Sequence, residues 1–379
     1  MTAGALLLGG CTDAAPDASS SQPSSQPSSQ PSSRPAPAPA VRPWPRVPPA
    51  EAGFDAATLR GVAREARAAG SSCLLVARAG RVVGEWYWRD GAPEAPREVF
   101  SVTKSLTALL VGLAVDDGVL APGDRVARYV PAWRGTPSAG VTVRDLLSGV
   151  SGRAWTQDDD YAGLLRATDR TGFALERGQD APPGERWVYS NGAVQVLDAV
   201  LRAATGEPTA DYAQRRMLDP LGMTASRMTP DASGRSTNTA FGLQSTCRDL
   251  ARLGDLVAGN GETDGERLLS RAWVRAVVGQ PSQPLNAAYG LLWWLNRRGT
   301  VAGAFDQPGT GSPVPEPGQL APSAPQEAVA ALGFGGQVLL VDPTSSTVVV
   351  RLGDPFVSRR GADYSFADAA RALEALDAG

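Results

Sequence analysis

The chain has 379 residues, of which 42% are hydrophobic, with a formal net charge of -3 and a pI of about 5.3. This length allows one large domain or two ordinary ones, and the mildly acidic balance argues against nucleic acid as a partner. Histidine is absent, and there are three cysteines. These counts exclude a Ser-His-Asp triad and every histidine-containing metal motif, so any nucleophile must be activated by Lys, Tyr or a carboxylate. No metal or cofactor is expected.

The first residues are small or apolar and end in Leu8-Gly9-Gly10-Cys11. This pattern resembles a bacterial lipoprotein signal over residues 1–11 with Cys11 as the lipidated residue; the alternative is an ordinary apolar N-terminus. Residues 12–48 are mostly Ser, Pro, Gln and Ala, a composition that predicts a disordered tether. We therefore expect an extracytoplasmic protein, lipid-anchored at the cell membrane, with its folded domain over residues 49–379.

If Cys11 carries lipid, Cys73 and Cys247 remain. An oxidising compartment would permit a disulfide between them. The sequence allows two separate buried thiols equally well, because it does not give their distance.

Turn signals and hydrophobic periodicity predict the elements of the domain. Asp55 is expected to cap a first helix that stops at Gly70. The expected strands are residues 73–77, 81–88, 289–296, 337–341 and 347–352. The further helices are expected at residues 101–117, 142–147, 192–204 and 209–218, from 246 onward, and at 365–377. We expect an α+β fold: one antiparallel five-stranded sheet, covered by N- and C-terminal helices, with a mainly helical insertion at about 125–285. The Pro/Gly-rich stretch 299–326 is expected at the rim of a pocket.

Ser101 and Lys104 open the first of these apolar helices. Residues three apart share a face of a helix, so the Ser101 hydroxyl and the Lys104 ammonium can meet. Burial would lower the pKa of the lysine and make it a proton acceptor. Taken alone, a Ser and a Lys at this spacing are usually a solvated helix start.

Two further motifs carry candidate chemistry. Tyr189 and Asn191 follow a Pro-Pro-Gly turn, so a phenol and an amide stand at the head of a helix. A phenolate beside an ammonium can take a proton from a serine, although a tyrosine that anchors a turn is the simpler interpretation. Residues 333–336, Gly-Phe-Gly-Gly, enter a strand, where a backbone N–H could complete an oxyanion hole with that of Ser101. A glycine-rich bulge is the alternative.

In this order, the three motifs resemble those of the serine β-lactamase and penicillin-binding protein superfamily. The likeness covers about residues 50–375 and is nearest to the class C-like branch of esterases, D-amino-acid peptidases and 6-aminohexanoate-dimer hydrolase. The stretches that carry it are Phe100 to Lys104, Asp145 to Gly152, Pro182 to Gly184, Tyr189-Ser190-Asn191, Tyr289 to Trp294 and Leu332 to Leu340.

The resemblance implies a β-lactamase/transpeptidase-like fold and a role for each site residue. Ser101 would be the acylated nucleophile and Lys104 with Tyr189 the coupled general base. Asn191 would position the substrate amide. Gln337, next to Gly336, would give the second oxyanion N–H.

The third motif departs from the family. Members that act on β-lactams or cell-wall peptides typically carry Lys-Thr-Gly or His-x-Gly where this chain has Phe334-Gly335-Gly336. The cation that would pair with a substrate carboxylate is missing. We therefore expect a serine hydrolase of a small ester or amide. A β-lactamase or D-amino-acid peptidase and a catalytically silent cell-wall-binding lipoprotein are the alternatives.

One shorter likeness concerns Asp160-Tyr161, which follow Trp155. They resemble a loop near the pocket of the dimer hydrolase branch. The run of aspartates favours an exposed acidic loop instead.

Overall fold

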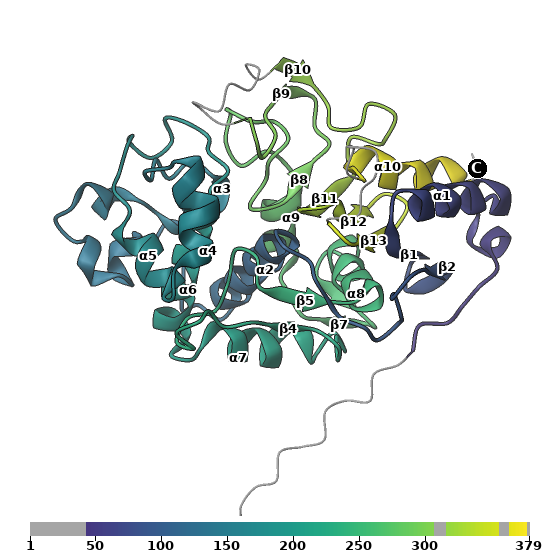
Figure 1. Cartoon of the computed structure of the whole chain (residues 1–379), viewed down its shortest axis with the longest axis horizontal. Coiled ribbons are helices and arrows are strands. Elements are labelled where there is room, and N and C mark those ends of the chain that lie inside the picture. The colour runs from purple at the N-terminus through teal and green to yellow at the C-terminus, as the bar shows by residue number, and fades with distance from the viewer. Residues whose placement is uncertain (1–42, 307–315, 356–363, 377–379) are drawn as a thin grey trace, which may run out of the picture. The chain divides into compact units, whose positions relative to one another are not determined.

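The computed structural model describes residues 43–306, 316–355 and 364–376 (Figure 1). Cys11 and most of the predicted tether lie outside the described residues. A six-stranded antiparallel sheet in the order β2-β1-β13-β12-β11-β8 forms the centre of the domain. Its strands are β1 (Ser71–Arg78), β2 (Arg81–Tyr87), β8 (Trp294–Leu295), β11 (Val329–Gly333), β12 (Gln337–Asp342) and β13 (Thr347–Gly353). The α+β class and the antiparallel sheet are confirmed, and the predicted number of five strands is wrong.

The sequence prediction missed β11 and made β8 too long. β11 contains a single β-branched residue, Val329, followed by two alanines, so its strand signal is weak. The segment expected as strand 289–296 folds back on itself. Tyr289 bridges Trp294, and the Gly290 N–H donates to the Trp293 carbonyl at 2.9 Å.

Helices cover both faces of the sheet. Along β1, Leu75 and Ala77 belong to one hydrophobic core, and Leu74 and Val76 to the other, because successive side chains of a strand point to opposite faces. Helices α2 and α8 pack on the first face, and α1 and α10 lie together on the second (Figure 1). Helices from the two ends of the domain cover the second face, as expected. The helices are α1 (Ala56–Ala68), α2 (Val102–Asp116), α3 (Val143–Ser148), α4 (Leu164–Arg166), α5 (Arg170–Glu176), α6 (Asn191–Thr205), α7 (Thr209–Ala213), α8 (Cys247–Ala258), α9 (Arg271–Val278) and α10 (Phe366–Ala370).

Side-chain caps begin five of the helices that the sequence predicted, namely α1, α3, α6, α8 and α10. Asp55 accepts a hydrogen bond from the Thr58 N–H and begins α1, and Ser365 forms a capping box with Asp368 before α10. The last helix is shorter than expected, because its final turn, Arg371–Ala375, is a 3-10 helix. The two ends of the domain meet. Phe54 bridges Leu376, and the Asp55 N–H donates to the Ala375 carbonyl at 2.7 Å.

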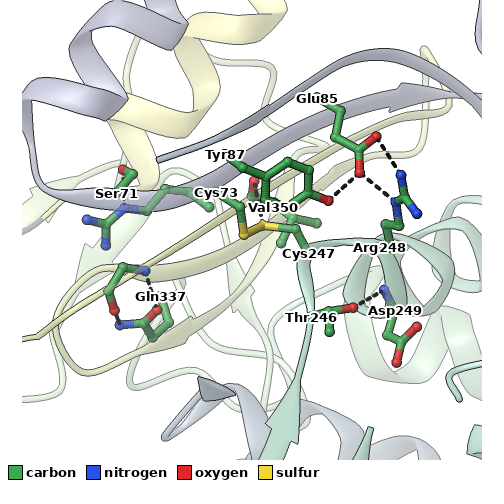
Figure 2. Close-up of a disulfide and its surroundings, with 12 residues drawn as sticks. Ser71, Cys73, Glu85, Tyr87, Thr246, Cys247, Arg248, Asp249, Gln337 and Val350 are labelled. Carbon is green, nitrogen blue, oxygen red and sulfur yellow. Dashed lines mark hydrogen bonds and ion pairs between the residues drawn. A yellow bond between two sulfur atoms is a disulfide. The ribbon is translucent and has the colours of Figure 1, made fainter. Parts of the chain in front are cut away.

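Cys73 and Cys247 form a disulfide with a Cα separation of 6.4 Å. It joins β1 to the first turn of α8, 174 residues later (Figure 2). Beside it, the buried carboxylate of Glu85 accepts hydrogen bonds from Tyr87 and Arg248. The sequence allowed either a disulfide or two separate buried thiols, and the structure shows the disulfide.

The segment between β2 and β8 is mainly helical. It also contains the small sheet β3-β5-β4 and the hairpin β6-β7, whose strands are β3 (Arg97–Glu98), β4 (Arg227–Met228), β5 (Leu243–Ser245), β6 (Glu262–Thr263) and β7 (Glu266–Arg267). After β8, β9 (Gly299–Val301) pairs with β10 (Glu316–Gly318), and residues 307–315 between them lie outside the described residues. Within the described ranges, no helix is both long and apolar enough to cross a membrane.

Candidate active site

Ser101 lies at the N-terminus of α2, directly after a strained residue. Phe100 has a φ of 48°, in the left-handed region that non-glycine residues seldom adopt. The Thr103 hydroxyl donates to the Phe100 carbonyl at 2.5 Å and accepts from the Leu243 N–H of β5 at 2.9 Å. Thr103 therefore ties the strained turn to the small sheet and fixes the backbone that presents Ser101.

Lys104 follows one turn later with a 1% exposed side chain. Its Nζ donates to Ser101 Oγ at 2.8 Å, to Asn191 Oδ1 at 2.6 Å and to the Ala240 carbonyl at 2.8 Å. Burial lowers the pKa of Lys104 to about 7, and the Asp160 carboxylate opposes that shift. Near neutral pH a substantial fraction of this amine is therefore unprotonated and able to accept a proton.

Tyr189 completes the group of side chains around the nucleophile. Its hydroxyl is hydrogen-bonded to Ser101, and Lys104 Nζ lies 5.0 Å from the centre of its ring. Burial raises the pKa of Tyr189, and the hydrogen bond with Ser101 acts in the opposite direction. Ser101, Lys104 and Tyr189, which the sequence predicted as nucleophile and general base, therefore meet at one point. Lys104 and Tyr189 are 85 residues apart in the chain.

A cluster of aromatic rings holds Tyr189 in place. Its ring stacks on Trp294 at 5.6 Å between centroids and meets Tyr289 edge to face at 6.1 Å. Trp187 packs against the same rings. The folded-back segment before β11 is therefore the support of the phenol, which explains why a continuous strand is absent there.

Asn191 is buried and already occupied by protein groups. Its Oδ1 accepts from Lys104, and its Nδ2 donates to the Asp160 carbonyl at 3.3 Å. The structure thus gives Asn191 a role in holding Lys104. The predicted contact with a substrate amide stays a prediction.

Gln337 and Gly336 lie where β11 turns into β12. The Gln337 side-chain amide donates to the Gly353 carbonyl at 2.8 Å, and its Oε1 accepts from the Gly353 N–H at 3.0 Å. The Gly336 carbonyl accepts from the buried Arg351 guanidinium at 2.8 Å. The Gln337 side chain therefore fastens the strand end, and the predicted oxyanion role, which concerns its backbone N–H, stays a prediction.

Strand β11 and the residue after it approach the turn before Ser101 through two contacts that the sequence did not indicate. A Cβ on Gly333 would lie 2.2 Å from the Val99 carbonyl oxygen, so only glycine permits this approach. The rings of Phe334 and Phe100 meet edge to face at 5.6 Å, and Phe334 is 50% exposed. An aromatic surface therefore lies beside Phe100, the residue directly before Ser101.

The expectation of an exposed loop at Asp160-Tyr161 is wrong. Asp160 is only 5% exposed and accepts hydrogen bonds from the Ser190 hydroxyl and from the N–H groups of Asn191 and Gly192. Tyr161 stacks on Phe305, and its hydroxyl interacts electrostatically with Tyr189. Three consecutive aspartates give no local signal for the buried one, and the short likeness to a pocket loop was the only indication.

In the described part of the chain, no group of three His, Cys, Asp or Glu side chains is placed to hold a metal ion.

Comparison with known proteins shows the family of the chain. A family model described as Beta-lactamase matches residues 50–374. The 6-aminohexanoate-dimer hydrolase of Paenarthrobacter ureafaciens is 25% identical over 314 aligned positions, in a match that covers 74% of this chain and 72% of that protein. The esterase EstB of Burkholderia gladioli is 36% identical over 141 aligned positions, but this match covers only 32% of this chain and 36% of the esterase.

Among solved structures, a penicillin-binding protein homologue from Caulobacter crescentus superposes with a TM-score of 0.61. The match covers 84% of this chain and 96% of the homologue at 19% identity. At this identity the likeness concerns the fold alone.

Proposed function

The chain belongs to the Beta-lactamase family, and from this premise we propose that it is a serine hydrolase that cleaves an ester or amide through an acyl-enzyme on Ser101. The observation that carries the proposal is the 2.8 Å hydrogen bond between Lys104 Nζ and Ser101 Oγ inside a buried site that also holds the Tyr189 hydroxyl. Relatives named as an esterase and as a 6-aminohexanoate-dimer hydrolase support the substrate class.

In the proposed reaction, Ser101 Oγ attacks the substrate carbonyl carbon while its proton passes to the unprotonated Lys104 amine. The developing oxyanion accepts hydrogen bonds from the Ser101 N–H and from a backbone N–H in the turn that holds Gly336 and Gln337. The carbonyl then re-forms, the bond to the leaving group breaks, and the leaving group takes a proton through Tyr189 and Lys104. Water attacks the acyl-enzyme by the same route and restores Ser101.

The protonation states of Lys104 and Tyr189 follow from their burial. Burial disfavours charge on both groups, so we propose a neutral phenol and, near neutral pH, a substantial fraction of neutral amine. The neutral amine has two N–H groups, so its lone pair accepts a hydrogen bond from Ser101 in place of the third donated one. Lys104 is then the proton acceptor, and Tyr189 donates and relays a proton. Apparent titration values will belong to the coupled pair.

Phe334 supports a substrate without a carboxylate beside the scissile bond. Its half-exposed ring offers apolar contact and no charge. A β-lactamase or D-amino-acid peptidase is the alternative activity, and turnover of a chromogenic cephalosporin against a short-chain nitrophenyl ester separates the two. A catalytically silent binding protein is disfavoured because the nucleophile, base and tyrosine already converge.

The decisive experiment is intact-mass analysis of the protein after exposure to a panel of esters, amides, β-lactams and a fluorophosphonate. We expect an adduct on Ser101 and its loss in Ser101→Ala. Retention of full ester hydrolysis in the folded Ser101→Ala protein would contradict the proposal.

We also propose that Cys11 is lipidated and that residues 12–48 hold the domain away from the membrane. The Leu8 to Cys11 pattern and the Cys73–Cys247 disulfide support an oxidising, extracytoplasmic location. Membrane fractionation of the full chain and of Cys11→Ala tests this, and recovery of both proteins in the soluble fraction would refute it.

A further inference from the structure

Asp160 is the buried member of three consecutive aspartates. The side chains of Asp158 and Asp159 are 82% and 41% exposed, whereas Asp160 as a whole is 5% exposed. All three lie in the π-helical turn Asp158–Gly163. Burial of a carboxylate is costly unless donors compensate it, so its position calls for a physical reason.

The donors come from the segment that carries the proposed catalytic tyrosine. Asp160 Oδ2 accepts from the Asn191 N–H at 2.8 Å. Its Oδ1 accepts from the Gly192 N–H at 2.8 Å and from the Ser190 hydroxyl at 3.0 Å. These three residues follow Tyr189 directly and form the first turn of α6. One carboxylate therefore fixes the backbone from which Tyr189 projects.

Asp160 also holds the side chain that contacts the lysine. Its backbone carbonyl accepts from Asn191 Nδ2 at 3.3 Å, while Asn191 Oδ1 accepts from Lys104 Nζ at 2.6 Å. Asn191 is thus held at both its backbone and its side chain by one residue. Only one side-chain amide separates Asp160 from the proposed general base.

Charge adds to this geometry. Burial raises the pKa of Asp160, whereas the hydrogen bonds from Gly192, Asn191 and Ser190 oppose that shift and favour the carboxylate. Tyr189 also lies near Lys104, and Tyr161 and Tyr289 interact electrostatically with Tyr189. Arg153, Arg177 and Asp159 line a small cavity together with Asp160. Through its charge, the Asp160 carboxylate favours the ammonium form of Lys104.

We propose that Asp160 is a positioning residue of the hydrolase, which clamps the start of α6 so that Tyr189 and Asn191 meet Lys104, and whose charge favours the ammonium form of that lysine. This inference rests on the proposed role of Lys104 as general base. Removal of the charge should favour the neutral amine, so the pKa of Lys104 should fall. Loosening of the clamp should lower kcat by misplacing the phenol.

The chain itself supplies a direct readout, because Lys104 is its only lysine. Lysine labelled with ¹³C at the ε-carbon gives one side-chain signal, whose shift against pH reports the titration of Lys104 without any substrate. In Asp160→Asn we expect the midpoint to fall by about one pH unit. We also expect kcat/KM for a nitrophenyl ester to fall by about tenfold to a hundredfold.

Asp158→Asn is the matched control, since it removes the same charge from the same turn at an exposed side chain. It should leave both the titration and kcat/KM at wild-type values. Asp160→Glu keeps the charge and displaces the clamp, so it should lower kcat at least threefold while the Lys104 midpoint stays near that of wild type. If Asp160→Asn does not fold, Asp160→Glu alone tests whether Asp160 positions the start of α6.

A folded Asp160→Asn protein with an unchanged Lys104 midpoint overturns the electrostatic part. Wild-type kcat in folded Asp160→Glu overturns the clamp. Because the NMR titration needs no turnover, these results are distinguishable from a failure of the proposed hydrolase activity, which Ser101→Ala tests.

Discussion

At the scale of single residues, the proposed mechanism depends on the protonation state of one lysine. The proposed reaction needs Lys104 unprotonated, and burial lowers its pKa to about 7. The rate should therefore rise with pH through this value and level off above it, because the pKa of Tyr189 is raised and the phenol keeps its proton. Below the midpoint we expect kcat/KM for a neutral ester to change about tenfold per pH unit.

Steady-state assays over a pH series measure this rise of kcat/KM with pH. Lys104→Ala should lower kcat by about 10²–10⁴-fold and abolish the rise. A rise of kcat/KM centred near the ordinary pKa of lysine, or a rise that persists in Lys104→Ala, would show that another group is the base.

A second prediction at the scale of single residues concerns substrate selectivity and Phe334. Phe334→Lys introduces the missing cation beside Ser101, so the ratio of kcat/KM for a succinyl half-ester to that for a neutral ester should rise about tenfold. The control is Val119→Lys, which adds the same charge at a 40% exposed site elsewhere. Equal ratios in the two variants would mean that position 334 does not face the acyl group.

At the scale of elements, strand β11 has to touch the turn before the nucleophile. In Gly333→Ala the new Cβ would lie 2.2 Å from a backbone oxygen, which cannot move aside cheaply. We expect kcat to fall about tenfold and the free energy of unfolding to fall by about 1–3 kcal/mol. Gly123→Ala, where a Cβ meets nothing within 4 Å, should change neither quantity. A fully active Gly333→Ala enzyme would mean that the strand is free to shift.

The disulfide between β1 and α8 links elements without touching the reacting groups. In Cys73→Ala/Cys247→Ala the free energy of unfolding should fall by about 2–5 kcal/mol, because the unfolded chain loses the constraint of a long loop. Denaturant titration with and without reductant measures this. Reductant should affect the wild type and leave the double variant unchanged, while kcat/KM stays within about threefold of wild type. Equal stability of the two proteins would contradict the expected contribution.

At the scale of the whole molecule, local patterns predicted much of the fold and part of the site. Ser101 and Lys104 share a helix face by spacing alone, and Asp55 and Ser365 carry their capping signals in the sequence. β11 was missed because alanine has little strand preference. Asp160 was misjudged because its neighbours have the same side chain but are solvated. The pairing of Cys73 with Cys247 depends on a distance that only the fold defines.

The bridge between Phe54 and Leu376 has a consequence for how the chain could be rewired. Since the ends of the domain are adjacent, about five glycine and serine residues should join them. New termini could then open at Asp264-Gly265, the turn between β6 and β7, far along the chain from the catalytic motifs. Such a circular permutant should fold and hydrolyse the ester within about threefold of the native rate. Persistent insolubility would indicate that the native order of synthesis, and not only the final contacts, governs assembly.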